Sequence, residues 1–385
     1  MNIRFRPTLQ VIACSRAARG VLYTFDLEIL KTKFMIYSNV RFDDYVQYME
    51  EKVSDIVTKA FQHVFATSRA RNEQCLNVKP EVTKQLIGVV MTSALEVRNW
   101  YQWHRRMLSE RNIYLKNRLT WFSFGIIDRF KTARNFVQDE KLNIFERFHL
   151  ACKYYLETDL KMLWENMSVD DKANIQERIP NSRSLEIQLR MLQRNSTIDW
   201  DQLSLTERKG NFFNDNYEGI RYYFTKLKGQ IVRCQCITSA VNYPGTHHFD
   251  LYSCLSRMDK GEINFTLDRL RSEKLFVIFK SFLHWPLQSM FLKFALNFKQ
   301  YIDSDVLRNL IQIMLFEKIE IGWQDCQYNI LLKSLCFVMP EEFVDHVKKD
   351  EKVYSVLKRV LKNPMPFDLE EYRHYIDNYR KDRLC

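Results

Sequence analysis

Apolar side chains recur every three or four residues along most of this chain, which is the period of a helix with one buried face. One such pattern covers residues 42–65. A longer one begins at Pro80, a favourable first helical residue, and continues to about residue 118. After a break at residues 121–125, the apolar stripes are 10–15 residues long and are separated by short polar stretches. The pattern predicts an all-α protein.

The other stripes predict short helices joined by short loops. A first helix should run from Pro7 to Gly20, where the glycine ends it. A helix capped by Thr158 or Asp159 should carry Leu160, Leu163 and Trp164, and caps are also expected at Ser272 and Ser304. Gly261 should end the helix that precedes it. The remaining helices are expected at residues 128–138, 144–157, 169–179, 185–192, 218–228, 249–258, 273–283, 287–298, 305–316, 323–337, 340–349, 353–361 and 370–380.

Two similar pentapeptides suggest an internal repeat. Residues 140–144 read Glu-Lys-Leu-Asn-Ile and residues 317–321 read Glu-Lys-Ile-Glu-Ile, so both are predicted to join one helix to the next. Together with the regular helix length, this favours stacked antiparallel helix pairs in an irregular HEAT-like α-solenoid, with a globular all-α domain as the alternative. In such a stack each helix contacts mainly its sequence neighbours. We expect buried side chains at Phe148, Trp164, Phe224, Phe291, Leu310 and Leu331, and solvated ones at Lys141 and Lys318.

Composition agrees with short polar loops and bears on the compartment. The 385 residues include only 9 Gly and 8 Pro, too few for a β-rich or glycine-loop fold. The nine cysteines are odd in number and scattered, and no run approaches 18 apolar residues. We therefore expect an intracellular, cytoplasmic protein, with the nucleus as the alternative, and no transmembrane segment. The oligomeric state is left open.

Charge divides the chain unevenly. Residues 1–120 hold 19 Lys and Arg against 11 Asp and Glu, whereas residues 121–385 are close to balanced. We therefore predict a basic N-terminal helical region at 1–120 and a helical-repeat region at 121–385. A basic patch on the long helix, interleaved with Trp100, Tyr101 and Trp103, could bind nucleic acid or an acidic partner. The patch consists of Arg98, Arg105, Arg106, Arg111, Lys116 and Arg118.

Candidate chemistry is sparse. Cys234 and Cys236, followed by His247, His248 and Cys254, form the nearest approach to a zinc motif, but one intervening residue is too short for the common cysteine knuckle. Core cysteines and a polar histidine pair in a loop explain these residues better, so no metal or cofactor is expected. The carboxylate pairs at 170–171 and 341–342 fall in first helical turns, where they stabilise the helix dipole. No catalytic residue is nominated.

Three segments resemble a large group of uncharacterised arachnid proteins. They are Gly125-Ile126-Ile127-Asp128 through Phe148-His149-Leu150-Ala151-Cys152-Lys153-Tyr154-Tyr155 to Leu163-Trp164, Phe282-Leu283-His284-Trp285-Pro286-Leu287-Gln288, and Lys318-Ile319-Glu320-Ile321-Gly322-Trp323. The resemblance implies an all-helical repeat architecture. It implies no activity and no site residue.

These observations lead to three functional hypotheses. The first is a non-enzymatic scaffold whose helical surface binds another protein, because solenoids expose long faces and no chemistry stands out. The second is nucleic-acid binding through the basic N-terminal third. The third, and least favoured, is an enzyme whose catalytic residues come together only in the fold.

Overall fold

In the computed structural model the chain is all-helical wherever it is described. The described residues are 3–23, positions 51, 53, 55, 56 and 59, 80–105, 107–108, 117–178, 182–206, 211–214, 216–320 and 322–362. Within them, β pairing is confined to an isolated antiparallel bridge between Trp121 and Ile127. None of the helices in these ranges combines the length and the apolar character that a membrane crossing requires. The all-α prediction is confirmed.

From α5 onward, most of the helices follow one another with short connections. The helices are α1 (Leu9–Leu22), α4 (Pro80–His104), α5 (Arg129–Val137), α6 (Ile144–Tyr154), α7 (Glu157–Asn166), α8 (Val169–Ala173), α9 (Ile175–Arg178), α10 (Arg183–Gln193), α11 (Trp200–Thr206), α12 (Ile220–Tyr223), α13 (Gln230–Ala240), α14 (His248–Leu255), α15 (Lys260–Leu267), α16 (Ser272–Ser281), α17 (Gln288–Asn297), α18 (Ser304–Gln312), α19 (Tyr328–Val338), α20 (Glu341–Lys348) and α21 (Glu351–Lys362). Short 3₁₀ turns occur at Asn211–Phe213 and Lys299–Tyr301, and a π-helix, η4, covers Ile313–Ile319.

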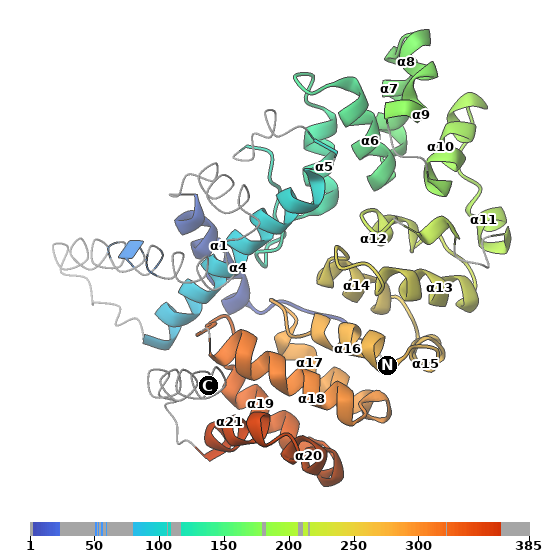
Figure 1. Cartoon of the computed structure of the whole chain (residues 1–385). Helices are drawn as coiled ribbons and strands as arrows, with labels where there is room; N and C mark the ends of the chain where they lie inside the picture. The colour runs from blue at the N-terminus through green and yellow to red at the C-terminus, as the bar shows by residue number, and fades with distance from the viewer. Residues whose placement is uncertain are drawn as a thin grey trace, which may run out of the picture.

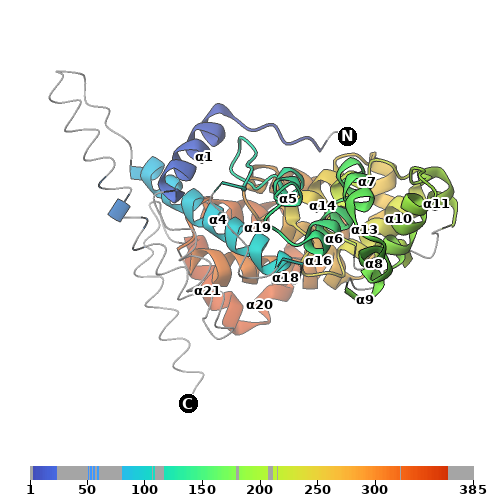
Figure 2. The ribbon, with the colours of Figure 1, turned by 90° about the horizontal axis from the view of Figure 1, so that it is seen from above.

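The helices from α5 to α21 are arranged around an arc, and α4 runs across its open side with α1 packed on it (Figure 1). The view from above shows α1 and the N-terminal segment on one side of this arrangement (Figure 2). Sequence neighbours pack along α5, α6 and α7, as predicted. In the second half, contacts between alternate helices, such as α16 with α18 and α18 with α20, are more extensive than those between neighbours. The prediction of mainly neighbour contacts is therefore wrong there, because alternate helices line up as layers.

The buried apolar side chains form one continuous cluster that reaches from Ile3 to Val360. Five of the six side chains predicted to be buried belong to it. Trp164 is only half-buried, with the Lys172 ammonium 5.3 Å from the centre of its ring. An indole at the edge of a helix pair can stay partly exposed and still cover the core beneath it.

Several predicted helix boundaries are wrong because side chains other than the expected ones end or begin the helices. Gly20 and Gly261 lie inside α1 and α15, and neither has the positive φ that would end a helix. Helix α6 was predicted to run to residue 157, but it ends at Tyr154, because the next residue, Tyr155, is in the left-handed conformation. Asp303 rather than Ser304 caps α18 by accepting from the Val306 amide.

Other caps and helices were also misjudged. Helix α7 begins at Glu157 without a side-chain cap, and Asp159 binds Arg134 instead of capping. Arg271 rather than Ser272 is the cap residue of α16. Helices α11, α13 and α15 were not predicted at all; α15 begins with a capping box between Asp259 and Glu262. The predicted helix at 370–380 and most of the one at 42–65 lie outside the described residues.

Candidate functional site

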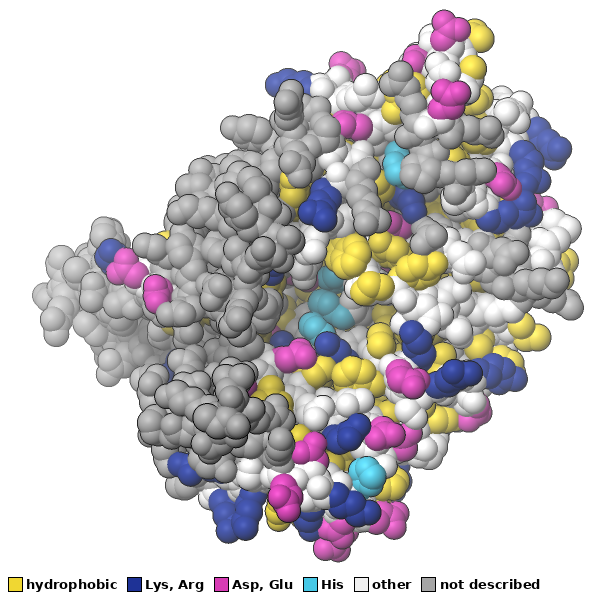
Figure 3. Space-filling view, viewed as in Figure 1, with side chains coloured by type: hydrophobic (Ala, Val, Ile, Leu, Met, Phe, Trp, Pro, Cys, Tyr) yellow, Lys and Arg dark blue, Asp and Glu magenta, His cyan; other side chains and the backbone are white. Residues whose placement is uncertain are grey.

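A pocket of about 560 Å³ lies where α4 meets α14, α16 and the segment after η4. The space-filling view shows histidine side chains in a hollow near the middle of one face (Figure 3). The lining combines carboxylates, imidazoles, ammonium groups, a guanidinium and indole rings from segments far apart in the sequence. It includes Thr92, Glu96, Asn99, Trp100, Trp103, Arg129, Tyr243, Gly245, His247, His248, Lys274, Lys280, His284, Trp285, Lys318, Trp323 and Asp325. A pocket of this size suits a small organic ligand.

Helix α4 forms one wall. Glu96, Trp100 and Trp103 are spaced four and three residues apart, which places them on one face of the helix. On the same helix Gly88 lies directly against the backbone of Gln324 and Asp325, where a Cβ atom would come within 2.3 Å of both. The absent side chain lets the two segments touch. This contact brings Asp325 to the pocket.

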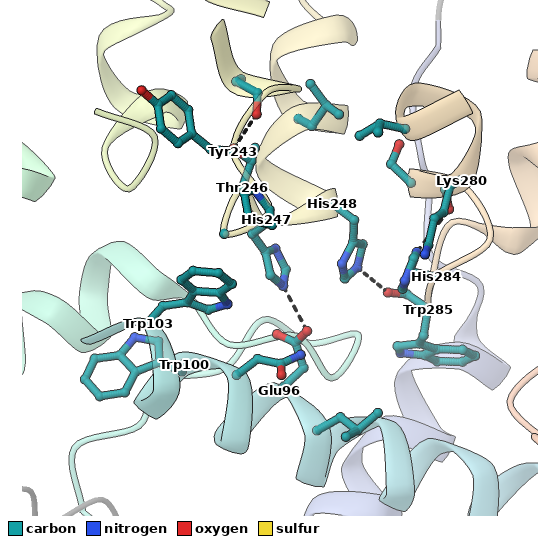
Figure 4. Close-up of a pocket in the computed structure, with 18 of the residues that line it drawn as sticks. Glu96, Trp100, Trp103, Tyr243, Thr246, His247, His248, Lys280, His284 and Trp285 are labelled. Atoms are coloured by element: carbon teal, nitrogen blue, oxygen red, sulfur yellow. Dashed lines mark hydrogen bonds and ion pairs between the residues drawn. The ribbon is translucent and has the colours of Figure 1, made fainter. Parts of the chain in front are cut away.

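The start of α14 forms the opposite wall. His247 is the N-cap residue and His248 the first helical residue, and both rings point toward Glu96 (Figure 4). The preceding turn is held by the Thr246 hydroxyl, which donates to the Ala240 carbonyl. At Gly245 a Cβ atom would lie 2.7 Å from the Trp103 ring, so glycine allows the turn to approach α4. The histidine pair predicted to occupy a polar loop is therefore a helix start directed inward.

Glu96 and His247 form a buried pair. His247 Nε2 lies 2.8 Å from Glu96 Oε1, and His247 Nδ1 accepts weakly from the Phe249 amide at 3.3 Å. Because Nδ1 accepts, Nε2 carries the proton and donates it to the carboxylate. Burial acts to raise the pKa of Glu96, but the interaction with His247, together with the nearby His248 and Arg129, outweighs burial and lowers the pKa to about 2. Glu96 is therefore ionised at neutral pH.

His248 and His284 extend the imidazole stack. The His247 and His248 ring centres are 4.2 Å apart, and those of His248 and His284 are 5.0 Å apart. His248 Nε2 donates to the Trp285 carbonyl at 2.8 Å, which leaves Nδ1 with its lone pair. Burial, reinforced by the neighbouring His247, lowers the pKa of His248 to about 3, and burial lowers that of His284 well below its ordinary value. Both rings are neutral at pH 7.

Two buried side chains on the pocket wall carry N–H groups that have no acceptor among the described residues. Arg129, 6% exposed, leaves Nε and Nη2 without one, and Trp100, 2% exposed, does so at Nε1. The guanidinium also bonds to the hydroxyl of Tyr154, which in turn lies 2.7 Å from His104 Nε2. His104 Nδ1 bonds to the Trp100 carbonyl, so the Tyr154 hydroxyl donates to Nε2. This series of hydrogen bonds holds Arg129 in place and leaves the Nε and Nη2 groups of Arg129 available.

The wall formed by η4 overturns one prediction. Glu317 and Lys318 were expected to end a helix, with Lys318 solvated as Lys141 is, but both lie within the π-helix. Its wide turn is closed by hydrogen bonds from the Glu320 amide to the Leu315 carbonyl and from the Trp323 amide to the Lys318 carbonyl. Lys318 is half-buried, with its ammonium 5.0 Å from the centre of the Trp323 ring. Lys141 is exposed in a turn, so the two pentapeptides are not structural equivalents.

The cysteines named as possible zinc ligands do not join the histidines. Cys234 and Cys236 are buried on α13, Cys254 is buried on α14, and all three are free thiols. Among the described residues, the group close enough to share an ion is Glu96, His247 and His248, whose ligand atoms lie within 4.8 Å of one another. The histidines were candidates from the sequence alone, but Glu96 was not recognised as their partner. The spacing of Glu96, Trp100 and Trp103 was the one sign in the sequence that these three side chains share a face of the helix.

The basic patch is not carried by one long helix, because α4 ends at His104. Arg98 is half-buried on α4, Arg105 is exposed just beyond its end, and Arg118 lies in a later turn. Arg118 pairs with Asp139 and lies 5.1 Å from the centre of the Phe136 ring. Trp100 and Tyr101 are buried, so they do not offer faces for base stacking. Arg106, Arg111 and Lys116 lie outside the described residues.

The carboxylate pairs lie where the sequence predicted them. Asp170 and Asp171 are in the first turn of α8, and Glu341 and Glu342 are in that of α20. Neither pair lines the pocket.

Comparisons with known proteins add no relative: no family model, no curated protein and no solved structure matches this chain.

Proposed function

We propose that this chain is a non-enzymatic binding protein, a HEAT-like helical scaffold whose central pocket takes a compact organic anion. The observation that carries the proposal is that buried N–H groups of two pocket-lining side chains, Nε and Nη2 of Arg129 and Nε1 of Trp100, have no acceptor among the described residues. A buried N–H group without a partner costs about 1–3 kcal/mol, and more if it is charged. A ligand with carboxylate or phosphate oxygens would recover that free energy.

The charges of the lining favour an anion as well. Arg129, Lys274, Lys280 and Lys318 face the pocket, against the carboxylates of Glu96 and Asp325. Lys280 and Lys318 have partners of their own, in Glu317 and in the Trp323 ring. The positive excess attracts an anion into a partly enclosed site where water screens it poorly.

Aromatic side chains indicate what the anion is attached to. Trp103 and Tyr243 line the pocket beside these donors, and each ring contacts Tyr217, at 6.3 Å and 5.5 Å between centres. Rings held in this way offer flat apolar faces to a ligand. The chemistry therefore fits a carboxylate or phosphate joined to a planar apolar group. This proposal differs from the first hypothesis drawn from the sequence, in which the helical surface binds another protein; here the helical array holds the walls of a pocket for a small molecule.

The test is calorimetric titration of the full chain, in EDTA, with 1-naphthyl phosphate, 1-naphthol and inorganic phosphate. We expect the ester to bind more tightly than the neutral alcohol or free phosphate. Arg129→Gln removes the charge and should weaken binding of the ester at least about tenfold, since a charged hydrogen bond contributes about 1.5–3 kcal/mol. Trp100→Phe removes only the indole donor and should weaken it less.

Arg105→Gln is the matched control, because Arg105 is an exposed arginine directly after α4, the helix that carries Trp100. It should bind the ester as the unmodified chain does. Equal binding of ester and alcohol, or an Arg129→Gln variant that is folded by circular dichroism and binds normally, contradicts the proposal.

A further inference from the structure

We infer that Glu96, His247 and His248 bind a divalent late transition metal ion such as zinc. One ligand atom from each residue lies within 4.8 Å of the other two, so a single ion can contact all three with small side-chain movements. Two imidazoles and one carboxylate are a ligand set that zinc, iron, cobalt and nickel accept in proteins. The three residues come from α4 and from the start of α14, 151 positions apart.

The hydrogen bond of His248 leaves one of its ring nitrogens free to bind a metal ion. Its Nε2–H group donates to the Trp285 carbonyl at 2.8 Å, so Nδ1 is the nitrogen with a free lone pair. Metal-binding histidines commonly donate their other N–H group to a carbonyl or carboxylate, which sets the tautomer and the ring orientation. His284 stacks on the same ring and restricts its rotation further.

For His247 to bind the ion, its ring proton must move from Nε2 to Nδ1. Its Nε2–H now donates to Glu96, and the ion would take the place of that proton, bound by Nε2 on one side and by a carboxylate oxygen on the other. The proton moves to Nδ1, so the imidazole stays neutral. The cost is the weak hydrogen bond from the Phe249 amide to Nδ1, at 3.3 Å. Since His247 is the N-cap of α14, metal binding is coupled to the start of that helix.

The three ligands leave room for a further one. All three line the 560 Å³ pocket, so the remaining positions of a four- or five-coordinate ion face its interior rather than the core. Arg129 and Lys318 also line the pocket and oppose a dication, so an anionic ligand in the open position should strengthen metal binding. The metal site itself does not depend on the ligand proposed above.

The test is titration of the metal-free chain with Co²⁺ and with Zn²⁺, without any organic anion and in a non-coordinating buffer. We expect one equivalent of Co²⁺ to give visible d–d absorption without the charge-transfer band of a cobalt thiolate. Zn²⁺ should displace it. A thiolate band would place the ion on the cysteines and overturn the inference, as would the absence of stoichiometric binding. This titration uses the unmodified chain, so its result does not depend on how any variant folds.

Variants locate the ion. Glu96→Gln and His248→Gln should each weaken Co²⁺ binding at least tenfold, because ligand losses exceed the 10–100-fold typical of outer-shell changes. His346→Gln is the matched control, a histidine on α20 that does not line the pocket, and should bind Co²⁺ as the unmodified chain does. Folded Glu96→Gln and His248→Gln variants with unchanged affinity would falsify the assignment. Because naphthyl phosphate binding is measured in EDTA, either proposal can fail without the other.

Discussion

Single side chains in this protein differ greatly in how much of the fold depends on them. Phe291 on α17 is fully buried, and Phe337 at the end of α19 is 90% exposed. Removing a buried phenyl ring loses its transfer free energy and leaves a cavity, whereas removing an exposed ring does neither. The pair therefore compares the same change in chemistry in two environments.

We expect Phe291→Ala to lower the free energy of unfolding by about 3–5 kcal/mol. Phe337→Ala should change it by no more than about 0.5 kcal/mol, as is usual for surface substitutions. Urea denaturation followed by circular dichroism measures both. Similar losses in the two variants would show that Phe291 is not packed as described.

At the scale of elements, a glycine inside α4 decides how closely that helix approaches residues 324–325. Gly88 and Gly20 both lie in helix interiors, where alanine is intrinsically better by about 0.5–1 kcal/mol. Around Gly20 no atom lies within 4 Å of a Cβ position, whereas at Gly88 backbone atoms lie 2.3 Å away. Backbone cannot turn aside as a flexible side chain can.

Alanine at the two positions should therefore act in opposite directions. Gly20→Ala should raise the free energy of unfolding by up to about 1 kcal/mol. Gly88→Ala should lower it, because α4 must separate from residues 324–325, and it should also weaken naphthyl phosphate binding by moving Glu96 and Trp100. Thermal unfolding and calorimetry check both effects. A Gly88→Ala variant as stable as Gly20→Ala would rule out the close contact.

For the whole molecule, the continuity of the core bears on how the chain unfolds. The buried cluster includes residues on both sides of position 120, and the pocket is lined from both sides as well. The Tyr252 hydroxyl adds a link across position 120 by donating to the Ile3 carbonyl. Segments that share one core tend to unfold together.

We expect one cooperative transition in urea, with tryptophan fluorescence and far-ultraviolet circular dichroism giving the same midpoint. Trp100 and Trp285 report on opposite sides of position 120, so the fluorescence samples both parts. Two separated transitions would instead support independent regions at 1–120 and 121–385.

The sequence by itself determined the helical class and much of the core. A stripe with the helical period must be buried against a neighbour, so Phe148, Phe224 and Phe291 were predicted to be buried without knowing what covers them. Helix ends were less predictable, because side chains compete for the same cap; Asp303 displaced Ser304 in this way. Helix α13, whose apolar residues form no clear stripe, was missed.

The pocket was decided only by the tertiary structure. Glu96 and His247 are separated by 151 positions, and nothing in the local pattern of either indicates the other. From the sequence, the part of α4 around Glu96 was predicted to form a basic patch. Packing turned that face inward, because Gly88 and Gly245 let α4 lie against two distant segments. Local periodicity reports which side chains need burial, but which ones meet depends on how the helices pack around the arc.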